Sequence, residues 1–284
     1  MPRGVVPRQP AKTGRQERSR LTAGSLPRTG FAHSAEGRPT RAPVATRIAK
    51  QPRPRLVKGY NPTTPERVSE ILKRLDQLYP EVTCALTHKS AWELLVATIL
   101  SAQSTDVNVN RVTPELFRKY PTVQDFAALR PEQLEPDIRS TGFFRNKSKS
   151  VVGAAQKIVS DFGGEVPSEM DQLLTLPGVA RKTANVVLGT WFEKGVGIVV
   201  DTHVTRVSRR LELTKNADAP KIEQDLLKVI PQEKWILFAH QLIWHGRKLC
   251  MARRPKCAEC LLENICHAAD KTWSTVEIHK SAKP

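Results

Sequence analysis

The segment LTLPGVARKTAN (residues 174–185) decides the fold of this 284-residue chain. Pro177 ends one short helix, Gly178 allows a tight turn, and a second helix begins near Arg181. Backbone N–H groups at the start of a helix point outward and form a ready site for a phosphate. The segment therefore predicts a helical hairpin, a motif that can grip a nucleic-acid backbone without reading its sequence. Taken alone, however, a Pro-Gly segment between two helices is more often a plain turn.

Apolar residues recur with helical spacing through most of the chain after Tyr60. Thr63 and Glu66 predict a capping box before the first helix, and Ser90 and Glu93 predict another before the second. Only residues 196–200 look like a strand, and one short run makes no sheet, so the predicted fold class is all-α. Further helices are expected near 112–120, 123–129, 131–135, 145–162, 168–176, 181–192, 202–211, 220–229 and 232–245.

The formal net charge of +17 indicates a polyanionic partner, most often nucleic acid. Residues 1–60 hold 14 Lys and Arg residues, two acids, eight prolines and six glycines, which predicts a disordered basic tail. The longest apolar run, residues 94–100, is too short to cross a bilayer, and residues 1–60 show no secretory signal pattern. These features exclude an integral membrane protein. Because most of the charge belongs to residues 1–60, the net charge alone does not show that residues 61–284 bind DNA.

Two charged residues near the hairpin are candidate catalytic groups. Lys182 lies in the first turn of the second hairpin helix, where the helix dipole opposes a cation and favours a neutral amine. A neutral amine is what nucleophilic catalysis requires, although the residues alone favour a simple phosphate contact. Asp201 precedes a helix expected to begin at Thr202, so on its own it is interpreted as an N-cap.

Four of the five cysteines lie within 17 residues near the C-terminus, with the spacing C-x6-C-x2-C-x5-C. Four thiolates at this spacing can surround one metal centre. Zinc is the generic alternative, but zinc sites usually have two close pairs and only one pair is close here. The odd total argues against a secreted disulfide scaffold. Cys84 lies outside the motif and is expected to be a buried apolar residue. The predicted ligands are Cys250, Cys257, Cys260 and Cys266.

The hairpin resembles that of the endonuclease III family, which comprises helix-hairpin-helix DNA glycosylases of base excision repair. Four segments carry the resemblance: LSAQSTDV (100–107), GFFRNK (142–147), LPGVARKTAN (176–185) and VDTH (200–203). Together they extend it over about residues 61–270. One departure is Ala180, where the family usually has a second glycine. A Cβ there either crowds the phosphate or is tolerated if φ is negative.

The resemblance implies a bifunctional DNA glycosylase/AP lyase that excises oxidised pyrimidines. Lys182 would be the nucleophile that attacks the sugar C1′, forms a Schiff base and cuts the strand by β-elimination. Asp201 would stabilise developing positive charge besides capping its helix. Related adenine glycosylases use a carboxylate in an early helix instead, and no carboxylate occurs between Glu93 and Asp106. A non-catalytic DNA-binding protein with the same fold is the other alternative.

An enzyme that acts on C1′ of a paired nucleotide must first extrude that nucleotide. The resemblance makes Gln103 the wedge, together with Phe143 or Phe144 from the opposite loop. The sequence alone instead places Phe143 in the core. The remaining predicted DNA contacts belong to the hairpin and to the cysteine loop. They are Gly178, Val179, Ala180, Arg181, Arg253, Arg254 and Lys256.

The resemblance further implies two helical domains. One is continuous over residues 84–194, and the other joins residues 61–83 to residues 195–270 and carries a [4Fe–4S] cluster on the four cysteines. Tails at 1–60 and 271–284 flank them. The expected protein is a bacterial, cytoplasmic and nucleoid-associated monomer that binds duplex DNA with damaged bases or abasic sites and no membrane. Organelle targeting by the N-terminal tail is the less favoured alternative.

Overall fold

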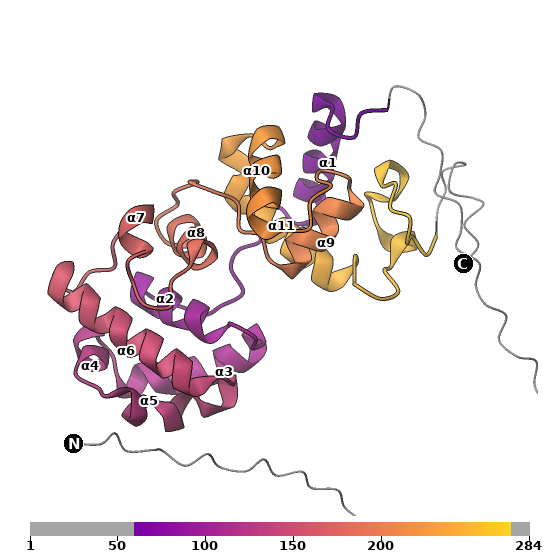
Figure 1. The fold of residues 1–284 in the computed structure, drawn as a ribbon. Helices are drawn as coiled ribbons and strands as arrows, with labels where there is room; N and C mark the ends of the chain where they lie inside the picture. Colours follow the sequence, from indigo (N-terminus) through magenta and orange to yellow (C-terminus); the bar gives the residue numbers. More distant parts are fainter. Residues whose placement is uncertain (1–59, 274–284) are drawn as a thin grey trace, which may run out of the picture. The chain divides into compact units, whose positions relative to one another are not determined.

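The computed structural model describes residues 60–273, and this part of the chain contains eleven α-helices, four short 3₁₀ helices and no strand. The predicted all-α class is therefore confirmed for the described residues. The predicted tails at 1–60 and 271–284 lie outside them, apart from Tyr60 and residues 271–273. The α-helices (Figure 1) are α1 (Pro65–Leu78), α2 (Ala91–Leu100), α3 (Asp106–Lys119), α4 (Val123–Ala127), α5 (Pro131–Ile138), α6 (Phe144–Asp161), α7 (Met170–Leu173), α8 (Arg181–Thr190), α9 (Thr202–Arg210), α10 (Ala219–Val229) and α11 (Trp235–Lys248).

Side-chain caps fix the starts of the first two helices. Ser90 Oγ accepts a hydrogen bond from the backbone N–H of Glu93 at 3.1 Å, which confirms the cap. The predicted box is incomplete, because the Glu93 carboxylate accepts the N–H of Lys89 and not that of Ser90. The predicted cap at Thr63 is wrong, because Thr64 Oγ1 accepts the capping bond of α1 at 3.4 Å. Pro65 occupies the first helical position, where its fixed φ suits a helix and its missing N–H costs nothing, so the cap falls one residue later.

Two other predicted segments differ in the structure. The predicted helix at 168–176 shortens to α7, and residues 174–176 continue it as turns, with hydrogen bonds from the N–H of Thr175 to the carbonyl of Gln172 and from the N–H of Leu176 to the carbonyl of Leu173. Residues 196–200 form no strand, because no extended segment in the described range pairs with them. Ile198 and Val200 still bury their side chains in a core, which explains the apolar pattern.

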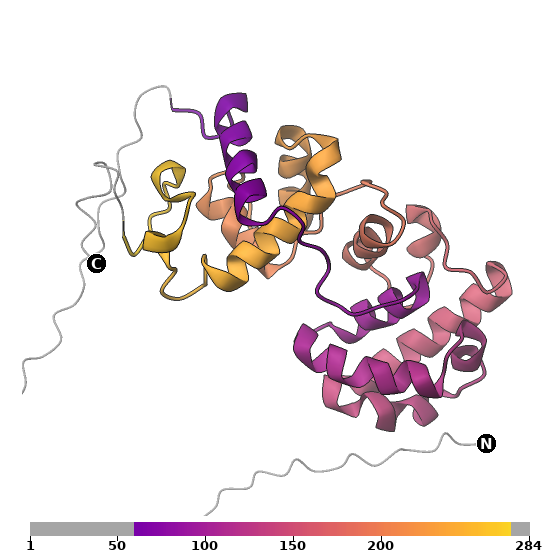
Figure 2. The same ribbon diagram turned by 180° about the vertical axis from the view of Figure 1, so that it is seen from behind.

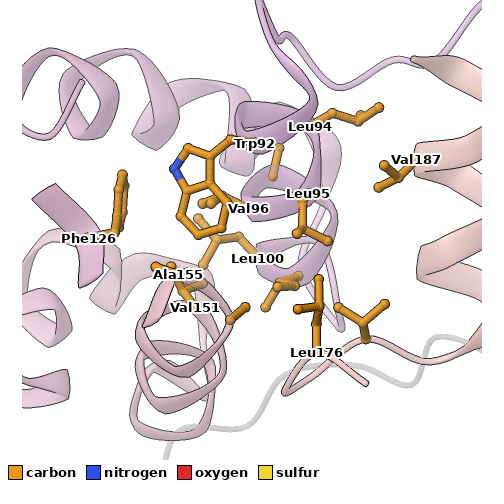
Figure 3. Packing of buried hydrophobic residues seen from close by; sticks show 14 of the residues in the cluster. Trp92, Leu94, Leu95, Val96, Leu100, Phe126, Val151, Ala155, Leu176 and Val187 are labelled. Carbon is orange, nitrogen blue, oxygen red and sulfur yellow. The ribbon is translucent and has the colours of Figure 1, made fainter. Parts of the chain in front are cut away.

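Helix α2 lies at the centre of one hydrophobic cluster, and α3, α6 and α8 pack against it. Residues 94–100 of this helix are buried on every side. The rings of Trp92 and Phe126 meet edge to face with centroids 5.3 Å apart (Figure 3). The longest apolar run of the sequence is therefore a core helix. None of the helices between residues 60 and 273 combines the length and apolar character needed to cross a membrane.

Helices α1, α9, α10 and α11 build a second hydrophobic cluster. Helix α1 packs against α11 although the two are far apart in sequence, and both views show them side by side (Figures 1 and 2). Ile71 and Leu75 of α1 are fully buried in this contact region. The two clusters share no buried member: the first uses residues 86–188, and the second uses residues 68–79 and 198–262.

The variant Phe126→Ala should lose about 3–5 kcal/mol of free energy of unfolding, because the ring is fully buried against Trp92, Phe117 and Tyr120. Phe143→Ala is the matched control, since this side chain is 61% exposed. It should change the same quantity by less than about 0.5 kcal/mol. Chemical denaturation followed by circular dichroism measures both. Similar losses in the two variants would contradict the core assignment.

Candidate active site

The predicted hairpin is present as α7, a turn at residues 177–180 and α8 (Figure 1). Gly178 has a φ of 77°, and a Cβ at this position would lie 2.5 Å from the Cβ of Ser150. The left-handed backbone and the close approach both require glycine. Ala180, by contrast, has a φ of −95°, which suits any L-residue. The alanine that departs from the family pattern therefore fits its backbone without strain.

The start of α8 carries no side-chain cap. Its N-cap residue is Ala180, whose carbonyl accepts the N–H of Ala184 at 3.0 Å but whose methyl group cannot bind the free N–H groups of the first turn. Arg181 and Lys182 in this turn are exposed. An uncapped helix start on the surface attracts anions through its donors and its dipole. The geometry expected of a phosphate anchor is thus in place.

Lys182 and Asp201 line the same pocket, which has a volume of about 90 Å³. Lys182 projects from α8, a helix of the first hydrophobic cluster, whereas Asp201 precedes α9, a helix of the second. The Nζ of Lys182 makes no hydrogen bond or ion pair with any described residue. The fold therefore brings an unengaged amine and a carboxylate to one concave site.

Asp201 caps α9 with only one of its carboxylate oxygens. Its Oδ1 accepts the backbone N–H groups of His203 and Val204, each at 2.8 Å. Its Oδ2 has no hydrogen-bond partner among the described residues. The predicted N-cap is confirmed, and the same side chain keeps a second oxygen that could act in chemistry.

Three polar residues that α11 contributes to this pocket were not singled out from the sequence. His240 and Trp244 come from α11, and burial lowers the pKa of His240 to about 4, so its imidazole is neutral near pH 7. Arg247 forms an ion pair with Asp106, with Nη2 and Oδ2 2.5 Å apart, which joins α11 to the start of α3. No motif marks these residues, because only the fold brings α11 to the pocket.

The buried carboxylate of Glu223 fixes the beginning of α8. Its Oε2 accepts the Nε–H of Arg181 at 2.9 Å, and its Oε1 accepts the amide of Asn185 at 3.0 Å. The hydrogen bond to Glu223 raises the pKa of the Arg181 guanidinium. The Arg181 side chain remains 45% exposed. The predicted DNA contact at Arg181 would therefore use donors that Glu223 leaves free.

Gln103 and Phe143 are both exposed, and both have left-handed backbones, with φ of 55° and 48°. The prediction that Phe143 packs in the core is wrong, because its side chain is 61% exposed. The adjacent Phe144 packs against the first cluster instead. The left-handed turn at Phe143 separates the two rings, and hydrophobicity alone gives no sign of such a turn. Strained, exposed residues concentrate at functional sites.

The four C-terminal cysteines line one cavity of about 30 Å³ and form no disulfide. The Arg210 guanidinium donates to Cys250 Sγ at 3.1 Å. Within residues 60–273, no three Cys, His or acidic side chains are arranged to hold a single metal ion. Four free thiols around one cavity are a donor set suited to a metal centre. Cys84 lies elsewhere, half-buried against the first hydrophobic cluster.

Arg253, Arg254 and Lys256 are exposed in the loop between the first two cysteines of the motif. The Lys256 Nζ lies 3.6 Å from a carboxylate oxygen of Glu259, a contact that solvent weakens. All three cations are thus accessible to a phosphate backbone. In the described part of the chain, the four C-terminal cysteines line one cavity, and Lys182 and Asp201 line a separate pocket.

Comparison with known proteins relates this arrangement to DNA repair. Residues 96–232 match the family model described as HhH-GPD superfamily base excision DNA repair protein. Endonuclease III of Synechocystis sp. is 54% identical over 204 residues, which cover 72% of this chain and 93% of that protein. Endonuclease III of Escherichia coli (strain K12) is 39% identical over 202 residues, which cover 71% and 95%.

A solved structure of a trapped endonuclease III–DNA covalent intermediate, an estranged-adenine complex, matches with a TM-score of 0.68 and 42% sequence identity. The match covers 72% of this chain and 95% of that one. A thermostable thymine-DNA glycosylase matches with a TM-score of 0.61 and 24% identity, and it shares the fold.

Gly178→Ala should distort the hairpin and weaken the binding of undamaged duplex DNA. The added Cβ collides with Ser150, and the left-handed backbone strains an alanine by about 1–3 kcal/mol. Ala180→Gly is the control, because its φ of −95° suits both residues, and its affinity should stay close to that of the wild type. Fluorescence anisotropy titrations give both dissociation constants. Unchanged binding by Gly178→Ala would contradict the anchoring role of the turn.

Proposed function

This chain belongs to the HhH-GPD superfamily of base excision DNA repair proteins and, within it, to the endonuclease III family, and we propose that Lys182 is the nucleophile of its reaction. It is a bifunctional DNA glycosylase and AP lyase. The observation that carries the proposal is the pocket that Lys182 shares with Asp201. An unengaged amine and a carboxylate in one pocket are the pair that attack at a sugar carbon needs.

The proposed substrates are oxidised pyrimidines in duplex DNA. The neutral Nζ of Lys182 attacks C1′, and the bond from C1′ to the base breaks, so that the base leaves with the bonding electrons and takes up a proton. The amine then gives up one proton, and the ring bond from C1′ to O4′ opens, so that O4′ leaves with the bonding electrons and takes up a proton, which gives a protonated Schiff base. Loss of a C2′ proton expels the 3′ phosphate by β-elimination. Water finally hydrolyses the Schiff base and regenerates the amine.

Asp201 supplies the negative charge for this reaction. Its Oδ2, which the helix cap leaves free, stabilises the positive charge that develops on C1′ and O4′ and accepts a proton from the attacking amine. The two N–H groups that bind Oδ1 hold the carboxylate in one orientation.

The proposed DNA contacts form three groups. Gln103 fills the gap left by the extruded nucleotide, and the exposed ring of Phe143 stacks beside the orphaned base. The hairpin residues Gly178, Val179, Ala180 and Arg181 bind the backbone through the helix start. The third group comprises Arg253, Arg254 and Lys256 in the cysteine loop.

The proposed cofactor is a [4Fe–4S] cluster held by Cys250, Cys257, Cys260 and Cys266. When bound, the cluster supplies a rigid clasp rather than a reacting group. Burial raises the pKa of the Cys260 thiol to about 12 and that of Cys266 to about 11, so cluster binding must displace their protons. The clasp would hold the intervening basic loop in a shape that meets phosphates.

The two hydrophobic clusters support the proposed division into one domain of residues 84–194 and another of residues 61–83 with 195–270. The proposed partner is duplex DNA that contains a damaged base or an abasic site. The enzyme is proposed to act as a monomer in the bacterial cytoplasm, associated with the nucleoid.

Borohydride should trap a covalent complex between the wild type and DNA that contains an oxidised pyrimidine, because it reduces the Schiff base. Lys182→Gln should form no such complex, whereas Lys221→Gln, which removes an exposed lysine of α10, should trap like the wild type. Denaturing gels measure the trapped fraction. Trapping that survives in Lys182→Gln would refute the nucleophile. Base release without strand cleavage by the wild type would favour an adenine-glycosylase type of reaction.

Asp201→Asn should lower the single-turnover rate of base excision on the order of 100-fold, since the charge is lost. The amide oxygen can still accept the two capping hydrogen bonds, so the free energy of unfolding should hardly change. Asp218→Asn, which alters an exposed acid before α10 whose side chain makes no cap, is the matched control. An excision rate equal to that of the wild type would rule out a catalytic role for Asp201.

Protein purified without oxygen should be brown, with a broad visible absorption and about four irons per chain. Cys266→Ser should lose the colour, whereas Cys84→Ser should keep it, because Cys84 packs against the first hydrophobic cluster and not in the cysteine cavity. Iron and zinc are measured by elemental analysis. A colourless preparation that contains stoichiometric zinc would contradict the cluster.

A further inference from the structure

Lys147 is a buried lysine that the proposed reaction does not use. It lies in the first turn of α6 and is only 5% exposed. Its Nζ donates to the carbonyl of Leu100 at 2.8 Å and to the carbonyl of Thr141 at 2.7 Å. It has no acidic partner among the described residues. Burial lowers the pKa of this amine, but the Leu100 acceptor lies at the C-terminus of α2, where the dipole favours a cation.

The two carbonyls that bind Lys147 lie at the roots of two exposed loops. Leu100 is the last residue of α2 and comes shortly before Gln103. Thr141 is the last residue of the 3₁₀ helix η1 (Arg139–Thr141) and comes shortly before Phe143. The backbone N–H of Lys147 also donates to the carbonyl of Phe143 at 3.1 Å. One residue therefore ties both loops to the same point of α6.

Asn108 forms a second tie between the same loops. It lies in the first turn of α3, and its Nδ2 donates to Ser104 Oγ at 3.1 Å and to the carbonyl of Ser140 at 3.0 Å. Ser104 follows Gln103 directly, and Ser140 belongs to η1. Asn108 is only partly buried, in contrast to Lys147. The loops are thus joined once in the interior and once near the surface.

These ties explain how two strained residues keep their backbones. Gln103 and Phe143 are both left-handed, which costs free energy for residues other than glycine. Such backbones persist where surrounding contacts over-determine them. The hydrogen bonds from Lys147 and Asn108 are contacts of this kind, since they fix the chain next to each strained residue.

We propose that Lys147 and Asn108 form a clamp that sets the separation of Gln103 and Phe143, and through it the extrusion of the damaged nucleotide. Lys147 is a positioning residue, because it is buried and acts only through the two loops. This inference rests on the proposed function, in which those loops enter the opened duplex. Unstacking costs most for a paired base and least for a site that is already open. The clamp therefore governs excision of a paired base more than cleavage at an abasic site.

The test compares two single-turnover rates on one duplex sequence: release of an oxidised pyrimidine and strand cleavage at a preformed abasic site. Lys147→Met keeps the length of the side chain and removes its donors. Asn108→Ala removes the second tie at a partly exposed position, so it carries the test if Lys147→Met does not fold. Ile158→Val, a buried change near the other end of α6, is the control for a general loss of stability.

Each clamp variant should lower base release on the order of 10- to 100-fold, as expected for a small misplacement of contacting groups. Cleavage at the abasic site should change far less, and the fluorescence of a 2-aminopurine opposite the lesion should rise less on binding than with the wild type. A ratio of the two rates equal to that of Ile158→Val overturns the clamp. A wild type that forms no borohydride-trapped complex overturns the proposed function, and the clamp with it.

Discussion

The buried carboxylate of Glu223 links the helix that carries Lys182 to the hydrophobic cluster that holds Asp201. Its side chain is 6% exposed and accepts hydrogen bonds from Arg181 and Asn185 of α8. A buried charge is costly unless its oxygens are bonded, so these contacts restrict α8 to one orientation against α10. Because Lys182 follows Arg181, it shares that orientation. The two clusters bury separate residues, and hydrophobic packing within each cannot set the distance between Lys182 and Asp201, the two proposed reacting groups.

Lys182 and Lys147 are suited to different roles because one is exposed and the other is buried. Lys182 is exposed at a helix start and has no partner among the described residues, so its amine is available for the proposed attack on a sugar carbon. Lys147 is enclosed at the ends of two other helical segments and uses its donors on carbonyls. A nucleophile must be able to lose its proton, whereas a structural cation must keep it. Both lysines lie in a first helical turn, and the deciding difference is what surrounds the nitrogen.

Much of the fold could be predicted from local patterns, because caps and helical periodicity act over a few residues. Ser90 and Asp201 cap their helices as expected, and the hairpin lies where the sequence places it. The cap at Thr64 was not predicted, because Pro65 occupies the first helical position and shifts the start of α1 by one residue. The exposure of Phe143 depends on a left-handed φ, and the pocket residue Arg247 depends on a contact between distant helices. Neither leaves a periodic signal in the sequence.

The distribution of charge now has a physical interpretation. The first 60 residues account for most of the net charge of +17, so the rest of the chain is only mildly basic. A mildly basic surface binds a polyanion well only if its cations lie where phosphates run and its acids are engaged elsewhere. Several acids near these sites are engaged within the fold: Glu223 bonds Arg181, Asp106 bonds Arg247, and one oxygen of Asp201 caps α9. Because the acids are paired internally, the cations of the hairpin and the cysteine loop stay exposed. A chain of modest net charge can therefore still present positive charge at the proposed DNA contacts.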